Sequence, residues 1–174
     1  MPRADAVAST RSTPRALLAV AATLFLLRIG AGIVQHRFPP EVPNFVSWHS
    51  PEDFHQRETK SGKPTLFYFT ARWCGPCEDL QREIFAHRST GSAINEAFYP
   101  VLVEDRRVED GFNSEQTSAL QQRFSIESFP TMVAVAVDGQ RPMKMRGYSG
   151  ESEALEWLRQ AEQALRRRPE IPVD

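Results

Sequence analysis

The chain has 174 residues, of which 41% are hydrophobic and 25% are charged, ordinary proportions for a globular protein. Its net charge of −1 and its pI near 6.4 argue against nucleic acid as a partner. With only 2 cysteines it has no disulfide framework, so we expect one packed domain with an appendage.

The N-terminal appendage is basic and apolar. Three arginines precede an apolar run at residues 16–34, ALLAVAATLFLLRIGAGIV, which is just long enough for a tilted crossing of a bilayer. Arg28 interrupts the run toward its far end, from where its side chain could snorkel to the interface. The arginine excess predicts a cytoplasmic segment at 1–15, a transmembrane anchor at 16–34 and a domain on the periplasmic or extracytoplasmic side.

Three other interpretations of the apolar run remain open. A cleaved signal peptide would have its apolar region at 16–27 and a weak small-residue cleavage site at Gly30-Ala31-Gly32. An organellar presequence fits the abundance of Arg, Ser and Thr, and a buried core helix fits the apolar run alone. The anchor and the signal peptide both place the domain in an exported compartment.

The domain itself is expected at residues 45–168, between a Pro-rich linker at 35–44 and a tail at 169–174. A Ser-Pro pair at 50–51 predicts the N-cap and first turn of a helix that stops near Gly62. This helix opens the series of elements that make up the domain.

A buried strand leads directly into the cysteine motif. PTLFYFT, at residues 64–70, is a short aromatic and apolar run that predicts a strand covered on both faces. WCGPC follows at 73–77 and holds both cysteines. EDLQREIFAHRS, at 78–89, then predicts a helix. The residues expected on one face of this helix are Leu80, Ile84 and His87.

The remaining elements alternate between helix and strand. Asn113 is expected to cap a helix in a capping box with Gln116, Asp138-Gly139 signals a hairpin, and Ser149 is expected to cap the last helix. Crossover helices imply parallel pairing of the first strands, whereas the final hairpin is antiparallel. In chain order, these elements are a helix at 91–98, a strand at 99–103, a charged loop at 104–111, a helix at 113–124, strands at 131–137 and 141–146, and a helix whose apolar stripe is Leu155, Leu158, Ala161 and Leu165.

The predicted fold class is therefore α/β, with a central mixed sheet of about four strands flanked by helices and preceded by an N-terminal transmembrane helix.

The cysteine pair is best suited to dithiol exchange. Cys74 would stand at a helix N-terminus, where unpaired N–H groups and the helix dipole stabilise a thiolate and lower its pKa below about 8.5. Cys77 would lie one turn later, shielded, while Cys74 is partly exposed. A structural zinc site needs four ligands, of which the motif supplies two, so no metal is expected. A purely structural disulfide here would close a very short loop and constrain little of the unfolded chain.

These residues also carry a family resemblance. TARWCGPC after a buried strand, with SFPT before a later strand, resembles the thioredoxin superfamily. GKPTLFYFTARWCGPCEDL, the loop at 104–111, and VDGQ followed by RGYSG are similar to the periplasmic C-terminal domain of the thiol:disulfide interchange protein DsbD and to other exported thioredoxin-like proteins. The resemblance covers roughly residues 45–165.

The resemblance implies a thioredoxin-like fold and a role for each motif residue. Cys74 would be the nucleophile and Cys77 the resolving thiol, with Gly75 and Pro76 as the active-site loop between them. Their redox-active disulfide would be the only cofactor. Pro130 would follow a cis peptide bond and face the cysteines. The implied substrate-binding residues are Trp73, Phe129, Pro130 and Gly147.

Two positions depart from the family pattern. Members of the family carry a buried acid six residues before the first cysteine, where this chain has Tyr68. A lysine often paired with that acid would fall near Val101, which is apolar. Losing both together leaves no stranded buried charge. The proton of Cys77 would then go to water or to Glu104.

The leading functional prediction is a thiol:disulfide oxidoreductase that acts as a reductant outside the cytoplasm, because Gly75-Pro76 matches the reducing members of the superfamily. Its partners would be protein disulfide or thiol substrates and an upstream membrane electron donor. An alternative is a slow or redox-inert peptide-binding module, which Tyr68 and Val101 keep open. A copper-handling role for the two thiols is a further alternative.

Overall fold

The computed structural model describes residues 14–37, 42–54 and 62–166, and side chains in the first of these ranges only at 17–30. Most of the predicted segment at 1–15 and the whole of the predicted tail at 169–174 lie outside these ranges. The chain divides into two compact units, Met1–Glu41 and Val42–Asp174.

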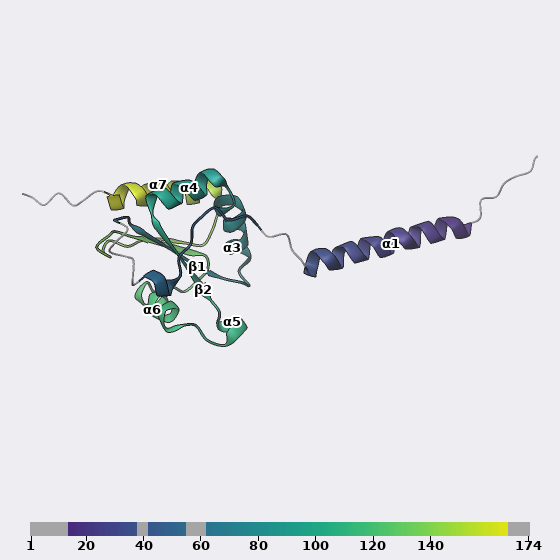
Figure 1. Cartoon of the computed structure of the whole chain (residues 1–174), viewed down its shortest axis with the longest axis horizontal. Coiled ribbons are helices and arrows are strands. Elements are labelled where there is room, and N and C mark those ends of the chain that lie inside the picture. Colours follow the sequence, from purple (N-terminus) through teal and green to yellow (C-terminus); the bar gives the residue numbers. More distant parts are fainter. Residues whose placement is uncertain (1–13, 38–41, 55–61, 167–174) are drawn as a thin grey trace, which may run out of the picture. The chain divides into compact units, whose positions relative to one another are not determined.

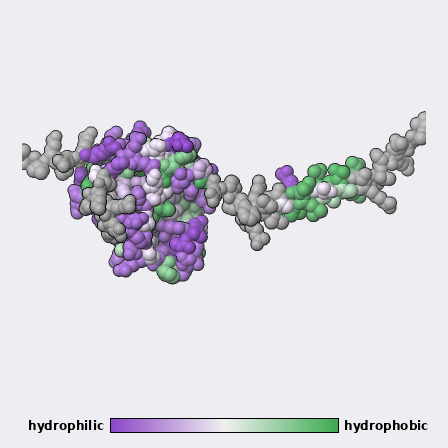
Figure 2. Space-filling view, viewed as in Figure 1, coloured by the Kyte–Doolittle hydropathy of each residue, from purple (hydrophilic) through white to green (hydrophobic). Residues whose placement is uncertain are grey.

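The first unit contains one helix, α1, Pro14–Arg37. The helix covers the predicted apolar run, and Figure 2 shows its hydrophobic side chains at the surface of the helix. Leu17, Leu24 and Phe25, for example, are each more than 60% exposed. Within the described ranges, no helix has both the length and the hydropathy of a membrane span.

The second unit is built on one sheet of four strands in the order β2-β1-β3-β4. β1 pairs with β2 in parallel, whereas β3 is antiparallel to both β1 and β4. The predicted mixed sheet and the final antiparallel pair are confirmed. The strands are β1 Thr65–Ala71, β2 Tyr99–Asp105, β3 Thr131–Val135 and β4 Met143–Arg146.

Helices cover both faces of the sheet, and each face has its own core. Leu66 and Tyr68 of β1 pack into a cluster with the helices α3, α4 and α7, whereas Phe67 and Phe69 pack into a second cluster with α6. This division follows from the period of two along a strand. Figure 1 shows α4 and α7 on one face and α6 on the other. The helices are α3 Gly75–Leu80, α4 Arg88–Ala97, α6 Glu115–Arg123 and α7 Glu151–Arg166.

The helix after the cysteine motif differs from its predicted form. It begins at Gly75, directly after Cys74 as expected, but it changes at Gln81 into a π-helix, η1, Gln81–Phe85. Leu80 and Ile84 are buried as predicted, but His87 is exposed. The π-helix ends before His87, which has extended backbone and stands as the N-cap of α4.

The starts of the helical turn at 51–54, of α6 and of α7 were predicted to within about one residue, whereas α4 begins at Arg88, three residues before the predicted start at 91. Ser50 accepts a hydrogen bond from the Asp53 N–H at 3.2 Å, as an N-cap does, and a helical turn follows at 51–54. The rest of that predicted helix, at 55–61, lies outside the described residues. The predicted caps Asn113 and Ser149 are wrong by one position, because Ser114 caps α6 and Gly150 accepts the first backbone bond of α7.

A buried carboxylate fixes the predicted charged loop, which contains a short helix, α5, Arg107–Asp110. Asp105, at the end of β2, is only 2% exposed. It accepts hydrogen bonds from Arg107 Nε at 3.0 Å and from Asn113 and Gln121, each at 2.8 Å. Burial opposes ionisation, but these three donors outweigh it and lower the pKa of Asp105 to about 2. Asp105 therefore ties α5 and α6 to the edge of the sheet.

We predict that Asp105→Asn lowers the free energy of unfolding by roughly 2 kcal/mol at neutral pH, because a charged acceptor with three donors is lost. The folded-state pKa of about 2 lies below the unfolded value of about 3.9, so the contribution is complete above about pH 4 and is lost as the pH falls toward 2. Urea unfolding at neutral pH and near pH 3 should therefore show a difference between the two proteins that shrinks in acid. Asp110→Asn, at an exposed ion pair with Arg106, is the control and should change little. An equal loss in both variants would contradict the role of Asp105.

Candidate active site

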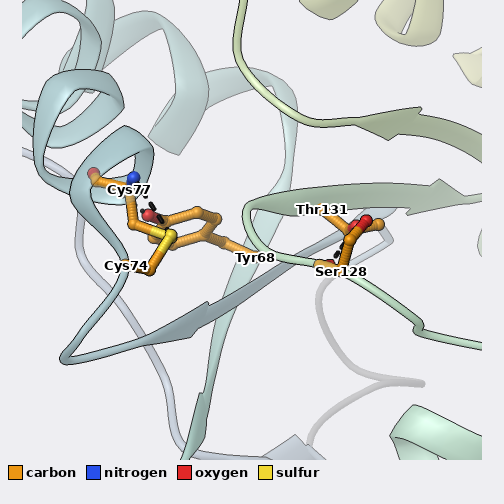
Figure 3. The surroundings of a disulfide bond; sticks show 5 residues. All are labelled: Tyr68, Cys74, Cys77, Ser128 and Thr131. Atoms are coloured by element: carbon orange, nitrogen blue, oxygen red, sulfur yellow. Dashed lines mark hydrogen bonds between the residues drawn. A yellow bond between two sulfur atoms is a disulfide. The ribbon is translucent and has the colours of Figure 1, made fainter.

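The two cysteines form a disulfide where β1 gives way to α3. Cys74 and Cys77 are joined with an S–S distance of 2.04 Å. Cys74 is the N-cap of α3, and its Sγ accepts a hydrogen bond from the Cys77 N–H at 3.2 Å. Figure 3 shows the disulfide beside the side chain of Tyr68. The predicted position of Cys74 at a helix N-terminus is confirmed.

Both sulfur-bearing residues are buried in the disulfide state. Cys74 is 3% exposed and Cys77 4%, so the expected exposure of Cys74 is not found in this state. The disulfide and the Cys77 N–H together hold the Cys74 sulfur over the first turn of the helix. Gly75 and Pro76 of the active-site loop are exposed, and the adjacent Trp73 is 58% exposed.

The predicted substrate-binding residues come together in part. The Phe129–Pro130 peptide bond is cis, as expected. The rings of Trp73 and Phe129 are in edge contact, with centroids 5.9 Å apart. The Gly147 N–H donates to the Pro130 carbonyl at 2.8 Å, and Gly147 has a positive φ of 75°, which a glycine adopts without strain. The structure thus links Trp73 to Phe129 and Gly147 to Pro130.

The loop before β3 is held by a side-chain bond that the sequence did not reveal. The Thr131 hydroxyl donates to the Ser128 carbonyl at 2.8 Å, in the surroundings of the disulfide (Figure 3). Thr131 is 1% exposed, whereas Ser128 is exposed. This bond spans the Phe129–Pro130 pair and so helps to fix its position.

Tyr68 fills the position where the family has an acid. Its ring packs against Trp48 and Phe85, with centroids 5.5 and 5.0 Å away. Its hydroxyl donates to the Cys77 carbonyl at 3.3 Å. Burial raises the pKa of Tyr68 to about 12, against a smaller opposing effect of a hydrogen bond with Thr70. The Tyr68 hydroxyl therefore cannot accept a proton from Cys77 near neutral pH.

The residue opposite Tyr68 is Leu102, which corrects the expectation for Val101. In the parallel register, Tyr68 pairs with Leu102 and Phe67 with Val101. Val101 therefore faces the other core, because a shift of one residue along a strand changes the face. Since Leu102 is also apolar, the position that would carry the paired lysine is still uncharged.

Sequence reasoning missed Trp48, which contacts both Tyr68 and Phe85. Trp48 precedes every predicted element of the domain, so no periodicity marked it. Among the residues that the structure describes, no three His, Cys, Asp or Glu side chains come together as metal ligands would.

The sequence pattern of the thioredoxin-like domain matches residues 56–162. The chain belongs to the thioredoxin-like domain family. It is 29% identical to "Protein disulfide-isomerase erp38" of Neurospora crassa over 97 residues, which are 56% of this chain. The match spans only 24% of the length of that curated relative.

Solved structures show the same thioredoxin-like fold. DsbH oxidoreductase matches with a TM-score of 0.58 and 18% identity over 71% of this chain and 89% of its own. The C-terminal domain of DsbD from Neisseria meningitidis also matches, with a TM-score of 0.46 and 19% identity over 64% of this chain and 88% of its own. The resemblance to the thioredoxin superfamily predicted from the sequence is confirmed by the family match at residues 56–162, and within that match Cys74 and Cys77 form a disulfide.

We predict that Tyr68→Phe lowers the free energy of unfolding of the oxidised protein by about 1 kcal/mol, because the Cys77 carbonyl loses a donor. The Gln81 N–H still donates to this carbonyl, so the loss stays modest. Urea unfolding of the wild type and of Tyr68→Phe measures this loss. The difference in unfolding free energy between the two proteins should be equal at mildly acidic and mildly alkaline pH, because the pKa of Tyr68 is about 12. A loss that changes between these two conditions would show that Tyr68 titrates there.

Proposed function

We propose that the protein is a thiol:disulfide oxidoreductase that works as a protein-disulfide reductant. The observation that carries this proposal is the Cys74–Cys77 disulfide at the N-terminus of α3 in a thioredoxin-like domain. The helix N-terminus stabilises a Cys74 thiolate, which is the nucleophile that dithiol exchange requires. The Gly75-Pro76 loop supports the reducing direction, since it matches the reducing members of the superfamily.

The reaction would proceed through a mixed disulfide. The Cys74 thiolate attacks a substrate disulfide, forms a bond to one substrate sulfur and releases the other as a thiolate. The Cys77 thiolate then attacks the Cys74 sulfur, the Cys74–Cys77 disulfide forms, and the second substrate sulfur leaves. The substrate gains two electrons and two protons, and the cysteine pair is oxidised. An upstream electron donor must return two electrons before the next turnover, and we propose a membrane reductase for this role.

Substrate would bind along the surface that surrounds the buried disulfide. Trp73 and Phe129 offer an aromatic contact there, beside the cis peptide bond before Pro130. Gly147 carries no side chain, and no atom of the described residues beyond its chain neighbours lies within 4 Å of the position that a Cβ would occupy, so a partner chain can approach. We propose that these residues bind an extended segment of a substrate protein next to its disulfide.

We propose that α1 anchors the protein in a membrane and that the domain lies on the periplasmic or extracytoplasmic side. The apolar run at 16–34 and the preceding arginines support this placement. The exposed apolar side chains of α1 are also what a helix embedded in lipid would present. A cleaved signal peptide would export the same domain without the anchor.

A second candidate function, a slow or redox-inert peptide-binding module, is favoured by Tyr68 alone. Without an acid at that position, the proton of Cys77 has no acceptor in the core cluster around Tyr68. The aromatic surface at Trp73 and Phe129 would then bind peptides without turning over disulfides.

Reduction of insulin by the full-length protein distinguishes the two functions. We predict that the wild type, supplied with dithiothreitol, precipitates insulin several-fold faster than dithiothreitol alone, and that Cys74→Ser abolishes this gain. Cys77→Ser should trap a mixed disulfide with insulin that non-reducing gels detect, because the resolving thiol is missing. No gain in the wild type and no trapped species in Cys77→Ser would favour the binding module.

The anchor is tested on the native protein from its own cells. We predict that mass spectrometry finds an N-terminus upstream of residue 16 and that alkaline extraction leaves the protein in the membrane pellet. A mature N-terminus near Ile33, with the domain in the soluble fraction, would instead establish a cleaved signal peptide.

A further inference from the structure

A cavity of about 330 Å³ with several polar side chains in its wall lies beside Cys77. Cys77 contributes to the wall of the cavity, whereas Cys74 does not. The volume is sufficient for several water molecules, and the wall has enough polar groups to bind them. The polar residues of the wall include Thr70, Arg72, Glu78, Gln81 and Glu104.

Few groups on this wall can take a proton at neutral pH. Tyr68 is excluded by its raised pKa, and Arg72 is already cationic. Two carboxylates remain, Glu78 of α3 and Glu104 of β2. Glu78 is exposed on the helix, whereas the side chain of Glu104 is 30% exposed and held in place from two sides.

Glu104 is fixed at the end of β2 by ion pairs with two arginines. Arg72 Nε donates to Glu104 Oε1 at 2.9 Å, and Arg106 Nη1 lies 3.6 Å from Oε2. In the register of the sheet, Glu104 pairs with Thr70, two residues beyond Tyr68 on the same face of β1. The carboxylate therefore belongs to the same side of the sheet as Tyr68.

Glu104 also borders a second cavity, of about 480 Å³. The two cavities share Trp48, Leu102 and Glu104. Glu104 is thus the one carboxylate that lines both, which gives it a second contact with solvent. The other titratable or charged residues of the second wall are His49, Glu52, Arg106 and Asp110.

We propose that Glu104 accepts the proton of the Cys77 thiol through water in the first cavity and so replaces the missing acid at position 68. This inference rests on the dithiol chemistry proposed above. In the mixed disulfide, the Cys77 S–H bond breaks and its proton passes through water to the Glu104 carboxylate. The Cys77 thiolate then attacks the Cys74 sulfur, the intramolecular disulfide forms and the substrate leaves as a thiolate. Glu104 returns the proton to solvent or to that leaving thiolate.

The test uses the reduced full-length protein and Ellman's reagent in stopped flow. Cys74 attacks the reagent and releases one thionitrobenzoate, and Cys77 then resolves the mixed disulfide and releases the second. The second phase reports the proposed step and requires no protein substrate. Insulin reduction, by contrast, tests the proposed oxidoreductase function. The role of Glu104 and the oxidoreductase function can therefore fail separately. Glu104→Gln keeps the shape of the side chain and removes the base, and Glu78→Gln is the matched control on the same cavity.

We expect Glu104→Gln to slow the second phase roughly ten-fold at neutral pH and to move its pH profile upward, while the first phase is unchanged. Glu78→Gln should leave both phases as in the wild type. A second phase in Glu104→Gln that is unchanged would overturn the proposal. So would a faster one, which would show that the carboxylate acts only by raising the pKa of Cys77 through its charge. Equal slowing in Glu78→Gln would also overturn it, because the effect would not belong to Glu104.

Discussion

Strand β1 is paired along both edges and covered on both faces, and the positions of the active-site groups follow from this constraint. Its odd and even side chains pack into different cores, so the strand cannot slide or rotate without exposing one of them. The strand ends at Ala71, and α3 begins within the next turns of the chain. The disulfide is therefore placed by a strand that is held on both edges and both faces, and it lies buried where that strand gives way to α3.

The same strand explains how a tyrosine is tolerated in place of an acid. Tyr68 points into the core between Trp48 and Phe85, where an ionised carboxylate would need a partner that Leu102 cannot provide. The phenol satisfies its polar atom by bonding to the Cys77 carbonyl, at the junction where α3 changes into the π-helix. Tyr68 thus joins β1 to α3, and on our proposal the proton of Cys77 is accepted in the polar cavity beside the core rather than within it.

The features that could be predicted best from the sequence are those that depend on a continuous run of buried residues or on a contiguous motif. The apolar run of β1 reflects a strand buried on both faces, and it was found to within one residue at each end. The predicted stripe of α7 reflects one buried helix face: Leu158, Ala161 and Leu165 are buried, whereas Leu155 is half-buried. The cis bond before Pro130 could be expected only from the family, since composition says little about peptide isomers.

What the sequence could not predict depends on distant contacts. The π-helix at 81–85, the role of Asn113 as a ligand of Asp105 rather than a cap, and the choice of Leu102 over Val101 all arise from pairing or packing between separate segments. The prediction that Cys74 is partly exposed was wrong for a related reason. The Cys77 sulfur and the Cys77 N–H both contact the Cys74 sulfur, and these contacts cannot be seen from the Cys74 position alone.

The burial of both sulfurs has a kinetic consequence. A thiol attacks a disulfide along the line of the S–S bond, and here each cysteine leaves less than a twentieth of its surface open. Small thiols therefore reach this disulfide more slowly than they would reach an exposed one. On the function proposed above, a substrate protein bound at Trp73 and Phe129 would be held beside the bond for longer than a small thiol. The oxidised domain would then exchange electrons faster with a docked protein than with the bulk thiol pool.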